Sequence, residues 1–227
     1  MKIGVLLSGC GVYDGSEIQE SVLAMLAIAE AGHEYVCISV DKKQYHVINH
    51  LTGEPMDEER NMMIESARIA RGDVHNINDV HPADIDAVVI PGGFGAAKSF
   101  TSWAFDGPAA TILTEVKLFI VNMINVGKPI CALCVSPVVV AKALEDSAFH
   151  ANMTLGSSEV KSPYDIKEFH TGIENIGAKS TEKGIKEVQV DKENRVVSAP
   201  CYMLETDILE VRNNIATAIN ETILLCE

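Results

Sequence analysis

Short apolar runs bounded by glycine or proline alternate along this chain with longer segments of helical periodicity, and this alternation restricts the fold more than any other feature. The runs are rich in valine, isoleucine and leucine, as in strands that are covered on both faces. Such strands, separated by helices, are typical of βαβ units and a mainly parallel sheet. The sequence predicts strands at KIGVLLS (2–8), EYVCISV (34–40), AVVIPGG (87–93) and KPICALC (128–134).

Helices are predicted at residues 16–32, 109–126 and 137–145, with a closing amphipathic helix at 204–226. The first of them has Ser16 and Gln19 at the spacing of a capping box and ends on Gly32. Residues 186–200 predict a β-hairpin around a polar turn. The expected fold is therefore α/β, with a doubly wound, mainly parallel sheet, helices on both of its faces and a C-terminal β-hairpin.

Residues 41–82 are too long for a plain crossover between two strands. They predict an insertion on the sheet, with a helix of its own near 58–70, and not a separate domain. With 227 residues, of which 47% are apolar, the chain is long enough to bury one sizeable core. We therefore expect a single domain over 1–227.

Charge and hydropathy exclude several classes of partner. The 18 basic and 32 acidic residues give a formal charge of −14, and no lysine or arginine cluster is dense enough to hold a phosphate backbone. No apolar run approaches the roughly 20 residues of a membrane span. The N-terminal MKIGVLLSGCG leads straight into a strand and does not resemble a cleavable signal. We expect a cytosolic protein that binds neither nucleic acid nor membrane, with its six cysteines reduced.

Two glycine-rich turns come close to the patterns of phosphate-binding loops. SGCGVYDGSE (8–17) comes within one residue of the dinucleotide fingerprint, but its last spacing is wrong. Asp14, Glu17 and Glu20 would also crowd the helix N-terminus where a pyrophosphate has to sit. GGFGAAK (92–98) lacks the Gly-Lys-Ser/Thr ending of a Walker loop. No nucleotide cofactor is expected.

Gly92 and Gly93 follow the third predicted strand, and two interpretations stay open for them. They could simply form a tight turn into a loop. Alternatively, because glycine has no Cβ, their backbone N–H groups could point into the crevice at the carboxyl ends of the strands, where open α/β sheets bind ligands. In that case they would supply oxyanion-type donors.

Cys131 and Cys134 have the spacing of a CxxC pair, but a shared metal or redox site is disfavoured. A closed zinc site needs four ligands, and the chain has no second CxxC or suitably spaced histidine pair. Pro137 marks the first helical turn, so both cysteines precede the helix. An odd offset along a strand sends the two side chains to opposite faces. Cys131 is then most simply a small buried hydrophobic residue.

Cys134 lies where a strand turns sharply into a helix, which is the position of a nucleophile elbow. The positive end of the helix would favour its thiolate, so we expect an exposed thiol with a lowered pKa; a second buried thiol is the alternative. Glu20, one turn into the first helix, is the best acid–base candidate, although a solvated first-turn carboxylate is equally common. His150 and His170 lack the carboxylate two residues on that a glutaminase uses.

Together these motifs resemble the DJ/ThiJ/PfpI superfamily, which has a flavodoxin-like, class I glutamine amidotransferase-like fold. Within it, the insertion resembles the ElbB-type branch of enhancing-lycopene-biosynthesis, or isoprenoid-biosynthesis, proteins. The similarity covers nearly the whole chain and is weakest over about 145–185. The segments that carry it are GCGVYDGSEIQESV (9–22), VINHLTGEPMDEERNMMIESARIARGDV (47–74), PGGFGAAK (91–98), KPICALCVSP (128–137) and VVSAPCYM (196–203).

The resemblance implies that Cys134 is the elbow cysteine, that Glu20 contacts it, and that the backbone of Gly92 and Gly93 faces the thiol. Several members convert glyoxal or methylglyoxal to a hydroxy acid without glutathione, and some of that activity has been described as protein deglycation. The resemblance also implies a homodimer. Val135 stands where protease-like members carry histidine, which argues against a Cys-His triad.

The resulting hypothesis is a glyoxalase-like enzyme without metal or nucleotide. The Cys134 thiolate attacks a small oxoaldehyde, Glu20 moves the proton between adjacent carbons, and backbone donors near Gly93 and Val135 hold the oxyanion. The alternative is a non-enzymatic regulatory or redox-sensing protein that uses the same reactive cysteine.

Overall fold

The computed structural model describes residues 1–227 and contains a seven-stranded sheet in the order β3-β2-β1-β4-β5-β9-β8. All neighbouring strands are parallel except β8, which runs antiparallel to β9 as the end of a hairpin. The strands of this sheet are β1 (Lys2–Leu7), β2 (Glu34–Ser39), β3 (His75–Asn76), β4 (Ala87–Ile90), β5 (Ile130–Leu133), β8 (Gln189–Asp191) and β9 (Val196–Ala199). β6 (Asn152–Met153) and β7 (Lys179–Ser180) form a small second sheet.

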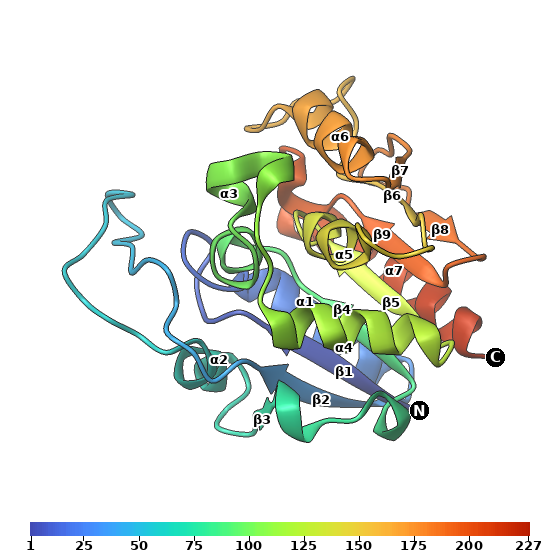
Figure 1. Cartoon of the computed structure of the whole chain (residues 1–227), viewed down its shortest axis with the longest axis horizontal. Coiled ribbons are helices and arrows are strands. Elements are labelled where there is room, and N and C mark those ends of the chain that lie inside the picture. Colours follow the sequence, from blue (N-terminus) through green and yellow to red (C-terminus); the bar gives the residue numbers. More distant parts are fainter.

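Helices cover both faces of the main sheet (Figure 1). α1 (Ile18–Glu30) and α7 (Ile208–Cys226) pack together on one face, and α4 (Thr114–Asn125) and α5 (Pro137–Leu144) on the other. The remaining helices are α2 (Met62–Ile69), α3 (Trp103–Asp106) and α6 (Ile166–Asn175), with one turn of π-helix at Ala96–Phe100. This arrangement confirms the doubly wound α/β fold.

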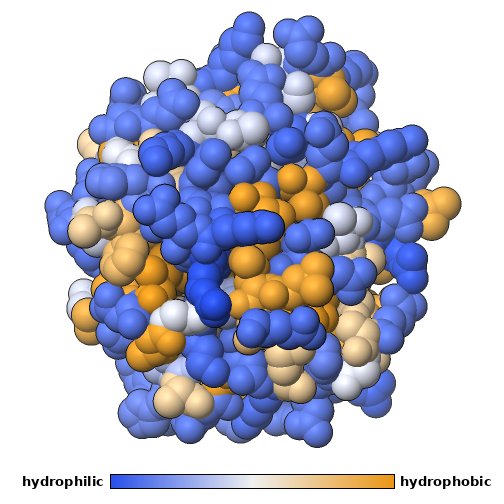
Figure 2. Space-filling model, turned by 90° about the vertical axis from the view of Figure 1, so that its right-hand side faces the viewer, coloured by the Kyte–Doolittle hydropathy of each residue, from blue (hydrophilic) through white to orange (hydrophobic).

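The core explains why the central strands are nearly unbroken apolar runs. Every residue of β4, β5 and β9 is buried, because these strands are covered on both faces. One cluster of 55 buried residues joins the sheet to the helices on either side. Figure 2 shows that polar residues dominate the face it displays, with small apolar patches between them.

The predicted elements are present, with one local correction. The helix expected near 58–70 is α2, within the insertion. α1 begins at Ile18 and not at Ser16, and its N-cap is Glu17, whose carboxylate accepts a 2.6 Å hydrogen bond from the Glu20 N–H. The capping box predicted from Ser16 is therefore wrong. The Ser16 hydroxyl instead accepts from the Ser8 N–H at 2.8 Å and fixes the turn after β1.

The turns after β1 and β4 are hydrogen-bonded to each other at the carboxyl edge of the sheet. The Glu17 N–H donates to the Gly92 carbonyl at 2.8 Å, and the Gly95 N–H donates to the Gly15 carbonyl at 2.8 Å. Gly93, at φ +97°, has no room for a side chain, since a Cβ there would lie 2.4 Å from the Glu17 nitrogen. This contact brings the start of α1 beside the ends of β4 and β5.

Candidate active site

Cys134 sits on the sharp turn between the end of β5 and the start of α5. Its backbone is left-handed, with φ +58°, which is uncommon outside glycine and typical of a nucleophile elbow. Two hydrogen bonds hold the turn: the Cys134 N–H donates to the Ala199 carbonyl at 2.9 Å, and the buried Ser136 hydroxyl donates to the Pro91 carbonyl at 2.6 Å. The strained residue is thus anchored to the ends of both neighbouring strands.

Glu20 projects from the first turn of α1 and is fully buried. Its Oε2 accepts a 2.8 Å hydrogen bond from the Gly92 N–H, and its Oε1 accepts a 3.2 Å hydrogen bond from the Tyr202 N–H. Two segments, both far from α1 in the sequence, therefore fix the carboxyl group. This is not the solvated first-turn carboxylate that was the alternative.

The thiol and the carboxyl group meet beside Gly92. A Cβ placed on Gly92 would lie 2.7 Å from Sγ of Cys134 and 2.7 Å from Oε2 of Glu20. Both groups thus border the space where a side chain would stand. Only glycine leaves that space free, so the close approach of thiol and carboxyl depends on this residue.

Burial dominates the ionisation of this pair. Loss of solvation first, and the nearby Glu17 carboxylate second, raise the pKa of Glu20 to about 8, against the opposing effect of the two N–H donors. Burial and the Glu20 charge also raise the pKa of the Cys134 thiol above its ordinary value, against the N–H groups of Val135 and Gly93. The expected lowered pKa is therefore wrong: the helix terminus is outweighed by desolvation.

The expected exposure of Cys134 is wrong as well, since the residue is only 6% exposed. The predicted backbone donors divide into two groups. The N–H groups of Gly93 and Val135 face the sulfur. The Gly92 N–H is committed to Glu20 and is not free for a substrate oxygen. Gly92 therefore serves the site by orienting Glu20 and by leaving room for it.

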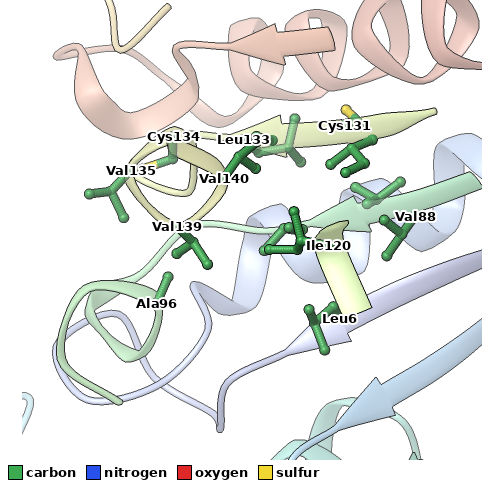
Figure 3. Close-up of a cluster of buried hydrophobic side chains, with 14 of the residues drawn as sticks. Leu6, Val88, Ala96, Ile120, Cys131, Leu133, Cys134, Val135, Val139 and Val140 are labelled. Carbon is green, nitrogen blue, oxygen red and sulfur yellow. The ribbon is translucent and has the colours of Figure 1, made fainter. Parts of the chain in front are cut away.

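Cys131 belongs to a different environment. It is fully buried within β5, and its sulfur lies on the side of α7, near Thr222 (Figure 3). Burial raises the pKa of its thiol to about 12. Cys134 and Val135 lie at the other end of β5, where the strand meets α5. The two cysteines are separate thiols, and all six cysteines are free.

A pocket of about 460 Å³, part of it open to solvent, leads to Cys134. Gly93, Val135 and Glu17 line it, together with five aromatic residues that sequence reasoning missed: Phe94, Trp103, Tyr164, Phe169 and Tyr202. They come from four separate segments of the chain, so no local motif joins them. The weakly matching region 145–185 supplies two of them.

No histidine lines this pocket. Both candidate histidines are hydrogen-bonded to backbone carbonyls elsewhere. Nε2 of His170 lies 3.1 Å from the Gly156 carbonyl oxygen, and Nδ1 of His150 lies 2.8 Å from the Gly177 carbonyl oxygen. No group of three or more histidine, cysteine, aspartate or glutamate side chains is placed to hold a metal ion. None of the helices is both long enough and apolar enough to span a bilayer. The reactive groups at the elbow are the thiol and the carboxyl.

Comparison with protein families and known proteins places the chain among relatives. The DJ-1/PfpI family model matches residues 10–199. The "ES1 protein homolog, mitochondrial" of Rattus norvegicus is 36% identical over 226 residues, covering 99% of this chain and 84% of the rat protein. The human "Glutamine amidotransferase-like class 1 domain-containing protein 3, mitochondrial" is also 36% identical, covering 99% of this chain and 83% of the human one.

Solved structures show the same fold. A protein from Ehrlichia chaffeensis described as an isoprenoid biosynthesis protein with amidotransferase-like domain superposes with a TM-score of 0.88 at 33% identity, with 99% of each chain covered. Glyoxalase III from Candida albicans superposes with a TM-score of 0.62 at 12% identity, covering 100% of this chain and 98% of the other. At that identity the second match shows the fold alone.

Proposed function

The chain belongs to the DJ-1/PfpI family, and from this premise we propose that it is a glutathione-independent, glyoxalase-type enzyme that converts 2-oxoaldehydes to 2-hydroxy acids. Cys134 is the nucleophile and Glu20 the acid–base residue. Release of the same aldehydes from glycated amines, a deglycase activity, would begin with the same thiol.

One observation carries the proposal: a thiol on a strained elbow and a buried carboxyl border the same small space at the end of a pocket. A carboxyl with a pKa of about 8 can both accept and donate a proton near neutral pH, as the reaction requires. An ordinary carboxyl group would be too weak a base for the thiol, and too strong an acid to keep a proton near neutral pH.

The first step forms a carbon–sulfur bond. Glu20 in its ionised form takes the thiol proton, and the Cys134 sulfur adds to the aldehyde carbon. The resulting oxyanion takes up a proton to give a hemithioacetal. The N–H groups of Gly93 and Val135, which face the sulfur in the free protein, would donate to this oxyanion and stabilise it.

The second step moves a hydrogen between carbons. Glu20 removes the proton from the former aldehyde carbon, and an enediol forms across the two oxygen-bearing carbons. Glu20 then returns a proton to the neighbouring carbon, which leaves a thioester of the 2-hydroxy acid. Water hydrolyses the thioester and regenerates the thiol. One carbon is oxidised and its neighbour reduced, so no external oxidant or reductant takes part.

The geometry favours this enzyme over the two other functions considered. A peptidase or glutaminase of this family uses a histidine beside the cysteine, and Val135 stands there instead. An oxidation sensor works best with an accessible thiol of low pKa, whereas Cys134 is nearly buried and its pKa is raised. A buried thiol served by a carboxyl fits a small substrate that enters a pocket.

The names of the relatives bear on the cellular setting. The rat and human relatives carry "mitochondrial" in their names, which does not match the cytosolic location expected from the sequence. The link to isoprenoid metabolism rests on the description of the Ehrlichia relative. The homodimer remains a prediction, which light scattering coupled to size-exclusion chromatography tests.

The decisive experiment incubates the purified protein with glyoxal and with methylglyoxal and measures glycolate and lactate by chromatography. Cys134→Ala and Glu20→Gln are each expected to lose more than about 100-fold in kcat/KM, the range in which a nucleophile or general base contributes. Cys131→Ala is the matched control and retains activity. If the wild type forms no more hydroxy acid than Cys134→Ala, the proposal fails.

A further inference from the structure

The second carbonyl oxygen of a 2-oxoaldehyde has no partner among the backbone donors at the elbow. The N–H groups of Gly93 and Val135, which face the sulfur, serve the oxygen on the aldehyde carbon. The neighbouring carbonyl oxygen gains negative charge when Glu20 removes the proton and the enediol forms. The Gly92 N–H is not free to serve it, because it donates to Glu20. A donor for this oxygen has to come from a side chain of the pocket.

Only two side chains of the pocket lining carry a hydroxyl group, those of Tyr164 and Tyr202. The Tyr202 hydroxyl is committed, because it donates to Oε1 of Gln19. Tyr164 donates through its backbone N–H to the Ser162 hydroxyl at 2.9 Å, and its own hydroxyl has no partner in the protein. No lysine, arginine or histidine lines the pocket, and the Glu17 carboxylate is an acceptor, for the Glu20 N–H. The Tyr164 hydroxyl is therefore the free donor of the lining.

The Tyr164 ring is fixed by two other aromatic rings. It meets the Phe94 ring edge to face with centroids 6.1 Å apart, and the Phe169 ring with centroids 6.4 Å apart. Burial first, and then the charges of Cys134 and Glu20, raise the pKa of Tyr164 to about 12. The phenol oxygen thus lies within electrostatic range of both reactive groups, and it keeps its proton at neutral pH.

The backbone of Tyr164 is tied to the turn that orients the Glu20 carboxyl. The Ser162 hydroxyl, which accepts from the Tyr164 N–H, donates to the Met203 carbonyl at 2.6 Å. Met203 follows Tyr202, whose N–H donates to Oε1 of Glu20 at 3.2 Å. A short chain of hydrogen bonds therefore joins the segment before α6 to the catalytic carboxyl, so the phenol and the carboxyl are held in a fixed relation.

We propose that Tyr164 is a catalytic residue, and that its hydroxyl donates a hydrogen bond to the second carbonyl oxygen of the 2-oxoaldehyde. The inference rests on the proposed function, because it assumes that the aldehyde carbon is bound to Cys134. As Glu20 removes the proton, the electron pair of the C–H bond passes into the new carbon–carbon double bond and leaves negative charge on this oxygen. The hydrogen bond stabilises that charge, and Tyr164 keeps its own proton.

Tyr164→Phe removes the hydroxyl and keeps the ring. We expect kcat/KM for methylglyoxal to fall at least about tenfold, because an enclosed oxyanion donor is worth about 100-fold or more. Water can replace part of this donor, since Tyr164 also borders an open hollow at the surface. The midpoint of urea unfolding should not change, because the hydroxyl has no protein partner to lose. Tyr35→Phe is the matched control: it loses the same atom from an exposed side chain of β2 and should keep wild-type activity.

A monoaldehyde separates this role from a structural one. Propanal can add to the Cys134 thiol but has no second carbonyl oxygen. It should therefore protect Cys134 from iodoacetamide at the same concentration in the wild type and in Tyr164→Phe, as measured by mass spectrometry of the labelled peptide. Weaker protection in the variant would show that Tyr164 shapes the pocket or acts on the thiol, and would overturn the proposal.

A change of acidity at the same position keeps the shape of the side chain and serves where Tyr164→Phe does not fold. 3,5-Difluorotyrosine is a stronger acid than tyrosine, so at position 164 it loses its proton at a lower pH. Its kcat/KM relative to the wild type should therefore fall between about pH 8 and pH 10, where the wild-type phenol is still protonated. A constant ratio over this range would contradict a role for the phenol proton.

The outcomes also separate this inference from the proposed function. If the wild type forms lactate from methylglyoxal and Tyr164→Phe does so equally fast, Tyr164 is not part of the mechanism and the enzyme proposal stands. If the wild type forms no hydroxy acid, both proposals fail. A loss of turnover in Tyr164→Phe, with propanal protection and urea unfolding unchanged, is the result that supports a donor to the second oxygen.

Discussion

The backbone N–H of Gly92 donates a 2.8 Å hydrogen bond to Oε2 of Glu20, a residue 72 positions earlier in the chain. This single bond joins the turn after β4 to the first turn of α1, directly beside the Cys134 thiol. It orients the carboxyl group, and it uses the N–H that would otherwise be a free oxyanion donor. The position has no space for a side chain.

Gly92→Ala should therefore disable the site. Its Cβ would lie 2.4 Å from Cβ of Cys134, so the elbow or α1 has to shift. We expect a loss of about 1–3 kcal/mol in the free energy of unfolding, as for other overpacked positions, and at least about a 100-fold loss in kcat/KM. Urea denaturation and the aldehyde assay measure the two effects. Gly184→Ala, at an open position, is the control; wild-type activity in Gly92→Ala would contradict the steric argument.

Activity should rise with pH up to about 8. Because burial raises the pKa of Glu20 to about 8, most of the protein holds this carboxyl protonated at neutral pH, and only the ionised form accepts the thiol proton. The thiol and the carboxyl titrate as a coupled pair, so the profile of kcat/KM reports apparent values for the pair. A rate that is flat from pH 6 to 9 would show that Glu20 is not the base.

Glu17→Gln should shift that profile to lower pH. The Glu17 carboxylate raises the pKa of Glu20, while its N-cap hydrogen bond to the Glu20 N–H needs only an oxygen acceptor, which glutamine retains. The midpoint of kcat/KM against pH should therefore move down with α1 intact, as judged by circular dichroism. An unchanged midpoint would show that burial alone, without Glu17, raises the pKa of Glu20.

The fold could be predicted from the sequence because each central strand is covered on both faces, and so is a nearly unbroken apolar run, and because each helix has a clear periodicity. Cys134 and Glu20 could be predicted as site residues from their positions alone. Cys134 follows a strand and precedes Pro137, and Glu20 lies in the first turn of α1. The burial of these two side chains could not be predicted from the sequence. Desolvation depends on α6, α3 and the segment around Tyr202, which cover the elbow from distant parts of the chain, and periodicity carries no information about that covering.

The pocket lining was missed for the same reason. Phe94 follows a glycine pair, Trp103 lies on a four-residue helix after the π-helical turn, and Tyr164 precedes α6 in the region that matches the family least. None of these residues belongs to a motif, and only the packing of α3 and α6 over the sheet brings them together. The sequence also could not predict that the N-cap of α1 is Glu17 and not Ser16, since this depends on the contact between two turns.

The cysteines should react with a thiol reagent in an order different from the one their sequence positions predict. Cys134 is nearly buried and the pKa of its thiol is raised, whereas Cys10 and Cys226 are partly exposed. Iodoacetamide at pH 7 should therefore modify Cys10 and Cys226 first, Cys134 more slowly, and the fully buried Cys131 and Cys201 last. Mass spectrometry of peptides from a time course gives the order. Modification of Cys134 ahead of Cys10 would show that the thiolate is favoured after all.

The stability of the protein should fall as the pH rises from about 4.5 to about 8. Burial raises the pKa of Glu20 from 4.5 to about 8 in the folded protein, so the folded state keeps a proton that the unfolded chain has already lost. The contribution of Glu20 is fully present below pH 4.5 and is lost as the pH passes about 8, a change of up to about 5 kcal/mol. Urea denaturation of the wild type and of Glu20→Gln at pH 5.5 and pH 8.5 tests this, because glutamine does not titrate. Between these two pH values the pH dependence should shrink by about 3 kcal/mol, the part of the change that falls in this range. An equal pH dependence in both proteins would mean that Glu20 is ionised in the folded state at neutral pH, which would also remove the basis for the expected rise in activity.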